Sequence, residues 1–180
     1  MKLLFISDIH GSYHYGKKIE EIYEKEKPDQ LVLLGDLLYH GARNPLTEEY
    51  SPKDLIPVLN KYRDKVMAVR GNCDSEVDQM VLDFDITADY SIIFVDGLKF
   101  FITHGHIYNE SKLPKGAFDV MVHGHTHIPV AEKKEHFYLF NPGSITLPKG
   151  GHPSSYGVYE NREFSVKDIA GVEMLKVKVE

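Results

Sequence analysis

The sequence predicts an α/β fold, and its first 36 residues carry the observations that lead to this class. Residues 3–6 and 31–34 are short, uninterrupted apolar runs, which are typical of strands buried on both faces. From Tyr15 to Tyr23 apolar residues recur at helical spacing, and Pro28 is expected to end that helix at the residue before it. A strand, a helix and a second strand in this order predict a parallel strand pair with a right-handed crossover.

The middle of the chain continues this alternation of strands and helices. Residues 40–51 are expected to form a long loop because turn-forming residues are frequent there. A helix is expected after Ser51, although Pro57 leaves open whether it begins there or near Asp54. Residues 66–69 form another apolar run, which predicts a third strand.

The second half of the chain predicts mainly strands. After a short helix expected at residues 77–82, residues 92–95 and 98–103 are expected to pair as a hairpin through Asp96-Gly97. Further strands are expected at residues 119–122, 137–140, 156–159, 163–166 and 172–179. No repeat or linker-like stretch interrupts the chain, so we expect a single domain over residues 1–180.

The composition narrows the classes of function. A chain of 180 residues that is 42% hydrophobic and 27% charged can bury a sizeable core. Its net charge of −6 disfavours nucleic acid as a partner, because such proteins need a basic face. Cys73 is the single cysteine, which excludes a disulfide framework and a cysteine-based zinc site. The apolar run at the N-terminus is too short for a signal peptide or a membrane span, so we expect a cytoplasmic protein without a membrane partner.

Side chains that can bind metal ions follow five of the expected strands. In chain order these are Asp8 and His10, then Asp36, then Asn72 and Asp74, then His104 and His106, and finally His123, His125 and His127. In α/β proteins, ligands bind beyond the carboxyl ends of the strands. Imidazole is the commonest metal-binding side chain. The pattern therefore predicts a metal site at one edge of the sheet.

Each of these patterns also has a simpler interpretation when it is taken alone. The three histidines from His123 to His127 could belong to a surface loop, and an aspartate after a strand often only bonds the backbone of a turn or caps a helix. His104 and His106 could be solvated, and Cys73 could be a small buried filler. The joint occurrence of the patterns is far more specific than any one of them.

Taken in order, the motifs resemble those of calcineurin-like metallophosphoesterases. The matching residues are Asp8-x-His10, Gly35-Asp36, Gly71-Asn72-x-Asp74, His104 and Gly124-His125-x-His127. Residues 71–80 and 141–144 are similar to the YfcE-like bacterial phosphodiesterases in particular. The resemblance implies an α/β, four-layer αββα sandwich of two mixed β-sheets flanked by helices, with a two-metal site at one edge.

The same resemblance assigns seven residues to two divalent ions that share Asp36. One ion is assigned Asp8, His10, Asp36 and His127; the other is assigned Asp36, Asn72, His104 and His125. Mixed oxygen and imidazole ligands suit Mn²⁺, the ion we expect, or Zn²⁺, Ni²⁺, Co²⁺ or Fe, rather than Ca²⁺. Two aspartates leave two positive charges that a bridging hydroxide and a singly charged phosphodiester would balance.

The predicted function is a binuclear, metal-dependent phosphodiesterase in which a metal-bridging hydroxide attacks phosphorus in line. A small phosphodiester is the expected substrate, and a homo-oligomer is possible. One alternative is a protein-interaction scaffold, because some eukaryotic relatives in vesicle sorting have degraded metal sites. A phosphomonoesterase or nucleotide hydrolase is another alternative, because a monoester dianion could also bind.

Five residues are candidates for a direct part in catalysis, namely Asp36, Asn72, Cys73, Asp74 and His104. Many relatives have a histidine at the position of Cys73, where it can protonate the leaving oxygen. A thiol is a weak donor near neutral pH, so we hypothesise slow turnover of esters with poor leaving groups. Asp74 matches the acid that would orient that histidine, and its role is therefore in doubt. The roles of His106, His123 and Arg43 stay open.

Overall fold

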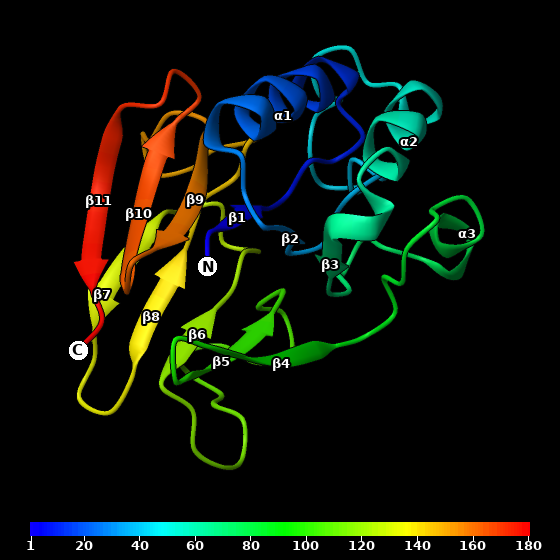
Figure 1. Cartoon of the computed structure of the whole chain (residues 1–180). Coiled ribbons are helices and arrows are strands. Elements are labelled where there is room, and N and C mark those ends of the chain that lie inside the picture. Colours follow the sequence, from blue (N-terminus) through cyan, green and yellow to red (C-terminus); the bar gives the residue numbers. More distant parts are fainter.

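The computed structural model describes all residues from 1 to 180, and its core consists of two mixed β-sheets packed face to face (Figure 1). The six-stranded sheet has the order β11-β10-β9-β1-β2-β3, and the five-stranded sheet has the order β4-β5-β6-β8-β7. The strands of the first sheet are β1 (Leu3–Ile6), β2 (Gln30–Leu33), β3 (Val66–Ala68), β9 (Ser155–Glu160), β10 (Glu163–Asp168) and β11 (Glu173–Lys178). Those of the second are β4 (Tyr90–Val95), β5 (Leu98–Thr103), β6 (Val120–Val122), β7 (Val130–Lys133) and β8 (Tyr138–Asn141).

The expected strand–helix–strand unit is confirmed at the N-terminus. Strands β1 and β2 pair in parallel, and helix α1 (Tyr13–Glu26) connects them. The side chain of Ser12 caps the first turn of α1 by accepting a hydrogen bond from the Tyr15 N–H. The helix ends where Lys27 adopts a left-handed conformation (φ 48°) directly before Pro28, which cannot continue a helix.

The other helices lie close to their expected positions. Helix α2 (Pro52–Asn60) begins directly after Ser51, and its first residue is a proline, which needs no hydrogen-bond partner there. Pro57 lies inside this helix without ending it. A single 3₁₀ turn, η1 (Arg63–Lys65), leads into β3. Helix α3 (Glu76–Gln79) is shorter than the expected range of 77–82, and a capping box fixes its first turn.

The second sheet contains the expected hairpin and one strand that the sequence did not indicate. Strands β4 and β5 pair through Asp96 and Gly97, which both have positive φ values, as a primed turn requires. Strand β7 was missed because its sequence, Val-Ala-Glu-Lys, has only two apolar residues and lies at the edge of the sheet, half exposed.

Two apolar layers follow from the alternation of side chains along the central strands. Leu4 and Ile6 of β1 face α1 and α2, whereas Leu3 and Phe5 face the second sheet. The layer between the sheets is aromatic, with Phe5 packed against Phe140 at 5.6 Å between ring centroids. Figure 1 shows α1 and α2 together on the outer side of the strands β1 to β3.

The two mixed sheets with flanking helices confirm the expected fold class. Helices α1 and α2 pack on the six-stranded sheet, and the outer face of the five-stranded sheet is covered by an irregular segment, residues 104–119. Tyr108 and Phe118 of that segment pack on Phe101 of β5 and supply the fourth layer there. None of the helices combines the length and the apolar character needed to cross a membrane.

Candidate metal centre

The parallel pairing of β1 and β2 brings the first two motifs to one edge of the sheet. Beyond the strands the two chains continue side by side, because the Asp8 N–H donates to the Gly35 carbonyl (3.2 Å) and the His10 N–H donates to the Asp36 carbonyl (2.9 Å). From the other sheet, the Gly124 N–H donates to the His104 carbonyl (2.8 Å). The carboxyl ends of strands from both sheets therefore meet at one place.

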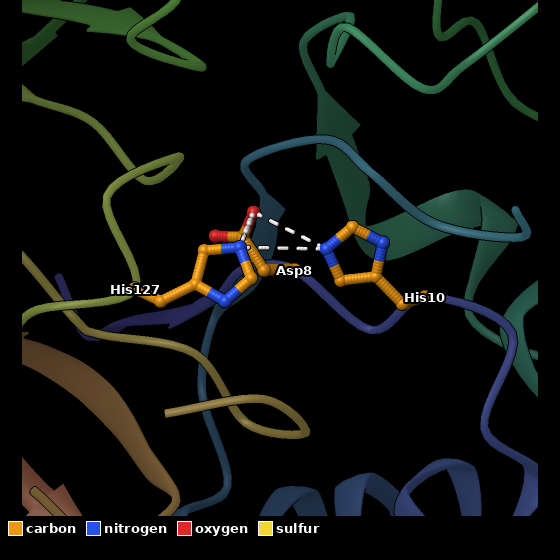
Figure 2. A group of neighbouring side chains, drawn as sticks. All are labelled: Asp8, His10 and His127. Atoms are coloured by element: carbon orange, nitrogen blue, oxygen red, sulfur yellow. Dashed lines mark hydrogen bonds and ion pairs between the residues drawn. The ribbon is translucent and has the colours of Figure 1, made fainter. Parts of the chain in front are cut away.

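Asp8, His10 and His127 form the first group of candidate ligands (Figure 2). The Nε2 atoms of His10 and His127 lie 3.4 Å apart, and the Oδ1 atom of Asp8 lies 3.2 Å from the latter nitrogen and 3.8 Å from the former. All three side chains are buried. These ligand atoms point at one another although the residues are up to 119 positions apart in the sequence.

Backbone carbonyls fix which nitrogen of each ring carries the proton. The Nδ1 atom of His10 lies 3.0 Å from the Tyr39 carbonyl, and that of His127 lies 2.6 Å from the Leu147 carbonyl. A carbonyl can only accept, so both Nδ1 atoms donate and a neutral ring keeps the lone pair on Nε2. In neutral rings the two Nε2 lone pairs would therefore face each other and the Asp8 carboxylate.

Asp36, Asn72, His104 and His125 form the second group. The Nε2 atom of His104 lies 3.5 Å from Asp36 Oδ2, 3.1 Å from Asn72 Oδ1 and 3.2 Å from His125 Nδ1. The same Asp36 Oδ2 atom lies 3.8 Å from His10 Nε2 of the first group. Asp36 thus stands between the two groups, in the position that a shared ligand requires.

The electrostatics of these groups fit cations. Asp8 Oδ1 is buried and has no hydrogen-bond donor. In the absence of a metal ion, burial lowers the pKa of His104, but the carboxylates of Asp36 and Asp8 outweigh burial and raise that pKa to about 9. The ring then carries an extra proton at neutral pH, in the place where a metal ion would supply the positive charge. Burial lowers the pKa of His125 to about 4, so its ring is neutral and able to bind metal.

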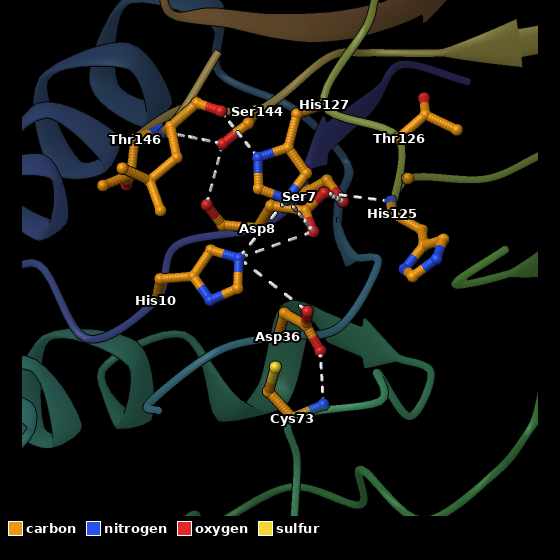
Figure 3. Close-up of polar contacts among 12 residues, drawn as sticks. Ser7, Asp8, His10, Asp36, Cys73, His125, Thr126, His127, Ser144 and Thr146 are labelled. Carbon is orange, nitrogen blue, oxygen red and sulfur yellow. Dashed lines mark hydrogen bonds and ion pairs between the residues drawn. The ribbon is translucent and has the colours of Figure 1, made fainter. Parts of the chain in front are cut away.

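The remaining oxygen of each carboxylate is held by the surrounding structure. Asp8 Oδ2 accepts hydrogen bonds from the Ser7 hydroxyl (2.5 Å) and the His125 N–H (3.1 Å), as Figure 3 shows. Asp36 Oδ1 accepts the Cys73 N–H at 2.8 Å. Each carboxylate is therefore oriented by one oxygen, and the other oxygen faces the site.

The backbone is strained at five of the seven candidate ligands. Asp8, His10, Asp36, His125 and His127 all have positive φ values, between 51° and 64°. Such values are uncommon for residues other than glycine and persist only where the surroundings hold them. They turn successive side chains of each motif inward, toward one point.

Two glycines let the chain segments approach closely enough. A Cβ atom on Gly71 would collide with the carboxylate of Asp36, and one on Gly124 would collide with the Ser7 hydroxyl. These clashes explain why glycine precedes Asn72 and His125 in the two motifs.

Asp74 and Cys73 lie beside the ligand groups and contact them in different ways. The Asp74 carboxylate accepts the backbone N–H groups of Asp36 (2.9 Å), Leu37 (2.8 Å) and Gly71 (2.7 Å), so it positions the loop that carries Asp36. Cys73 groups with His10 and Asp36 and lines the cavity above them. Burial, and then the charge of Asp36, raises the pKa of the Cys73 thiol to about 12.

Ser144 is a supporting residue whose role the sequence did not reveal. Its hydroxyl donates to the Asp8 carbonyl (3.0 Å) and accepts the N–H groups of Thr146 (3.2 Å) and Leu147 (2.8 Å) (Figure 3). It thereby ties the first ligand to the carbonyl that orients His127. The Asn-Pro-Gly-Ser motif was a signal of similarity but carried no indication of this contact.

His106 and His123 lie outside the ligand groups. The Nδ1 atom of His123 donates to the Gly124 carbonyl at 3.0 Å, and Asn141 donates to that same carbonyl at 2.8 Å, so both support the loop before His125. The ring of His106 lies 5.4 Å from the ring of His104, and its Nδ1 atom is buried without a partner.

A cavity of about 730 Å³ opens over both groups. It is lined by His10, Asp36, Tyr39, Gly41, Ala42, Arg43, Asn44, Asn72, Cys73, Asp74, Ser75, His125, His127 and Lys149. The sequence raised Arg43 as a residue of open role, but it gave no signal for Lys149.

Known proteins are similar to this chain over most of its length. The phosphodiesterase YfcE of Escherichia coli strain K12 is 48% identical over 167 residues, which cover 92% of this chain and 91% of that protein. The solved structure of a phosphoesterase described as Yfce from E. coli superposes with a TM-score of 0.97 at 45% identity over the whole of both chains. Vacuolar protein sorting 29 from Cryptosporidium parvum shares the fold alone, with 18% identity and a TM-score of 0.59 over 92% of this chain and 88% of that one.

A family model also matches most of the chain. Residues 1–163 match the model described as the calcineurin-like phosphoesterase superfamily domain. The match covers every residue of the two ligand groups. The chain therefore belongs to the calcineurin-like phosphoesterase superfamily.

Proposed function

We propose that this protein is a metal-dependent phosphodiesterase that holds two divalent ions, with Mn²⁺ as the native metal. The observation that carries the proposal is the cluster of buried acceptors at the strand ends. The Nε2 atoms of His10 and His127 and the Oδ1 atom of Asp8 converge, and that buried oxygen accepts no hydrogen bond. Structure that served packing alone would not leave such groups facing one another.

The chain's own residues would hold the ions and orient the substrate. When bound, two divalent ions supply Lewis acidity and a nucleophile at neutral pH. Asp8, His10 and His127 would hold one ion; Asn72, His104 and His125 would hold the other; and Asp36 would contact both. The carbonyls of Tyr39, Leu34 and Leu147 keep three of the imidazoles in the tautomer that can bind metal.

A diester is favoured over a monoester on two grounds. The relative from E. coli carries the name of phosphodiesterase at 48% identity. Asp8 and Asp36 leave two positive charges on a two-metal site, and a singly charged diester with a hydroxide balances them. The scaffold alternative has less support, because all seven candidate ligand positions are filled by competent residues that the fold brings together.

Cys73 would limit the range of leaving groups. With a pKa of about 12, the thiol does not protonate a leaving alkoxide efficiently at neutral pH. The Cys73→His variant is therefore expected to cleave alkyl diesters at least about tenfold faster, with little change for p-nitrophenyl diesters. Equal rates for alkyl diesters in both proteins would show that the position does not supply a proton.

Hydrolysis by metal-stripped protein is the direct test of the proposal. Bis(p-nitrophenyl) phosphate and p-nitrophenyl phosphate would be compared after separate addition of Mn²⁺, Ni²⁺, Co²⁺ or Zn²⁺. We expect metal-dependent cleavage of the diester in the wild type and in Asp64→Asn, an exposed aspartate outside the site. Inactivity with all four ions would favour the scaffold, and preference for the monoester would favour a phosphomonoesterase.

The setting of this activity is also part of the proposal. A small diester is the substrate, because a net charge of −6 disfavours a polyanion such as nucleic acid. The cytoplasm is the compartment, in keeping with a single, unpaired cysteine.

A further inference from the structure

We propose that Arg43 and Lys149 form an anion-binding subsite for a phosphodiester that carries a second negative charge, a carboxylate or a phosphate, on one ester arm. The inference rests on the proposed phosphodiesterase function and narrows its substrate class. Both side chains line the cavity that opens over the candidate ligands, and no other lysine or arginine does.

Arg43 lies in a fixed turn beside Cys73. The Asn44 N–H donates to the Gly41 carbonyl (3.0 Å), and the Asn44 side chain donates to the His40 carbonyl (2.9 Å), so the turn is closed by two hydrogen bonds. A Cβ atom on Gly41 would lie 3.1 Å from the Cys73 sulfur, which places this turn directly against the wall of the site. The long loop thus presents Arg43 at the side of the cavity formed by Cys73.

Lys149 enters from a different segment, after β8. Its backbone N–H donates to the carbonyl of His127 at 3.1 Å, and its own carbonyl accepts the His152 N–H at 3.3 Å. The position of Lys149 is therefore coupled to a candidate metal ligand. The two cations come from separate loops, one beside Cys73 and the other beside His127, and both line the same cavity.

Neither cation is neutralised by the protein. Some cations elsewhere have carboxylate partners, such as Arg70 with Glu76 at 3.3 Å, and others, such as the exposed Lys53, have none. The two acids in the loop of Arg43 face away from the cavity, because Glu48 pairs with His14 (3.4 Å) and Glu49 pairs with Lys17 (2.8 Å) of α1. Arg43 and Lys149 form no ion pair with any residue of the chain.

The charges of the cavity leave one positive charge over. The Asp74 carboxylate lies in the lining, where three backbone N–H groups hold it, and Asp36 belongs to the ligand groups. Asp8 and Asp36 offset two of the four charges of two divalent ions, and a diester with the hydroxide consumed in hydrolysis offsets the others. With a simple diester, the two cations Arg43 and Lys149 therefore face a single remaining carboxylate, Asp74, so one positive charge is left over, and a second anionic group would match it.

Three diesters with the same p-nitrophenolate leaving group test this subsite. Their second arm would be methyl, 2-carboxyethyl or choline, which is neutral, anionic or cationic. For the wild type with Mn²⁺, we expect kcat/KM for the carboxyethyl diester to exceed that for the choline diester at least about tenfold. Arg43→Gln and Lys149→Gln should each reduce this ratio about fivefold, and the double variant should bring it close to one.

A matched control separates the subsite from the general effect of net charge. Lys53→Gln combined with Arg63→Gln removes two exposed cations outside the cavity and should leave the ratio within about twofold. Equilibrium binding gives a second measurement: by calorimetry, methyl 2-carboxyethyl phosphate should bind the wild type more tightly than dimethyl phosphate, and the double variant should lose this difference.

The failure of this subsite and the failure of the proposed function have different signatures. If the three diesters are cleaved equally well by the wild type, or if the double variant keeps the ratio, the subsite is wrong and the phosphodiesterase function stands. If no diester is cleaved with any of the four metal ions, both proposals fail together.

Discussion

The protein buries carboxylates in two clusters, which differ in whether the chain itself supplies partners for the negative charge. Glu26, at the end of α1, receives hydrogen bonds from Lys167 (2.8 Å) and Tyr156 (2.9 Å) and an ion pair from Lys2 (2.8 Å). Asp8 Oδ1, at the strand ends, instead faces the Nε2 atoms of His10 and His127 and accepts no hydrogen bond. The first cluster is complete within the chain, whereas the second one leaves a buried carboxylate oxygen without a partner.

This difference separates a cluster whose charges are paired within the chain from the candidate metal centre. A buried charge is costly unless it is paired, and the Glu26 cluster meets that requirement with two lysines. In the strand-end cluster, the Oδ1 atom of Asp8 has no such partner. Five residues of this cluster also have positive φ values, which cost additional folding free energy. Burial of charge alone would not have distinguished the two clusters, but their donors and acceptors do.

The largest expected effect concerns the shared aspartate. Asp36→Asn removes one negative charge and can place amide hydrogens where a cation should lie, so we expect metal-dependent cleavage of bis(p-nitrophenyl) phosphate to fall at least about 1000-fold. Glu26→Gln, which changes the other cluster in the same way, should retain activity at a temperature where it is folded. If Asp36→Asn stays within about tenfold of the wild type, the two clusters are not different in function.

Added metal should stabilise the protein through the strand-end cluster alone. Mn²⁺ at about 100 times its dissociation constant is expected to add about 2.7 kcal/mol, or a rise in Tm of roughly 5–10 °C, to the wild type and to Glu26→Gln. Differential scanning calorimetry of metal-stripped protein would measure it. An equal rise in Asp36→Asn would place the binding site elsewhere.

The affinity for metal should also depend on pH with a definite sign. The metal ion competes with the proton that His104 carries below its pKa of about 9. Apparent affinity for Mn²⁺ is therefore expected to rise by up to about tenfold per pH unit between pH 7 and that value. Titration calorimetry in buffers of different ionisation enthalpy would count the released proton, and an affinity independent of pH would contradict the competition.

The Glu26 cluster should instead control acid stability. Although burial alone would raise it, the partners Lys167, Lys2 and Tyr156 lower the pKa of Glu26 from 4.5 to about 2. The cluster therefore stabilises the protein above pH 4.5, and this contribution is lost as the pH falls toward 2. Glu26→Gln should cost roughly 1–2 kcal/mol at neutral pH, which is less than the full shift implies because Lys2 is partly exposed. Chemical denaturation between pH 2 and 7 would show a flatter profile in the variant.

An effect of similar size on stability tests the support beneath the candidate metal centre. Ser144→Ala should destabilise the protein by roughly 1–2 kcal/mol and weaken Mn²⁺ binding several-fold, because it releases the Asp8 carbonyl and the turn at Leu147. Ser155→Ala is the matched control, since this buried hydroxyl contacts only the Pro142 carbonyl. Equal metal affinity in the two variants would mean that Ser144 acts on stability alone.

The sequence by itself predicted the candidate ligands, which the fold brings together, and most of the strands. Short apolar runs ending in Asp8, Asp36 and His104 were readable because strand burial and polar strand ends are both local signals. The parallel pairing of β1 and β2 also followed from the order of elements. Strand β7 was not predicted, because an edge strand needs few apolar residues. The irregular cover of the second sheet was not predicted either, because the sequence around Tyr108 does not indicate which face of a sheet this side chain packs on.

Only the tertiary structure decided how the ligands are aimed. The groups that orient His10, His104 and His127 are the backbone carbonyls of Tyr39, Leu34 and Leu147. Every residue has a carbonyl, so no motif can encode which one will meet an imidazole from another part of the chain. The same holds for Lys149, an ordinary loop lysine until the fold places it beside His127. The side chains that could bind metal are therefore visible in the sequence, but the orientation of their rings depends on backbone carbonyls from distant parts of the chain.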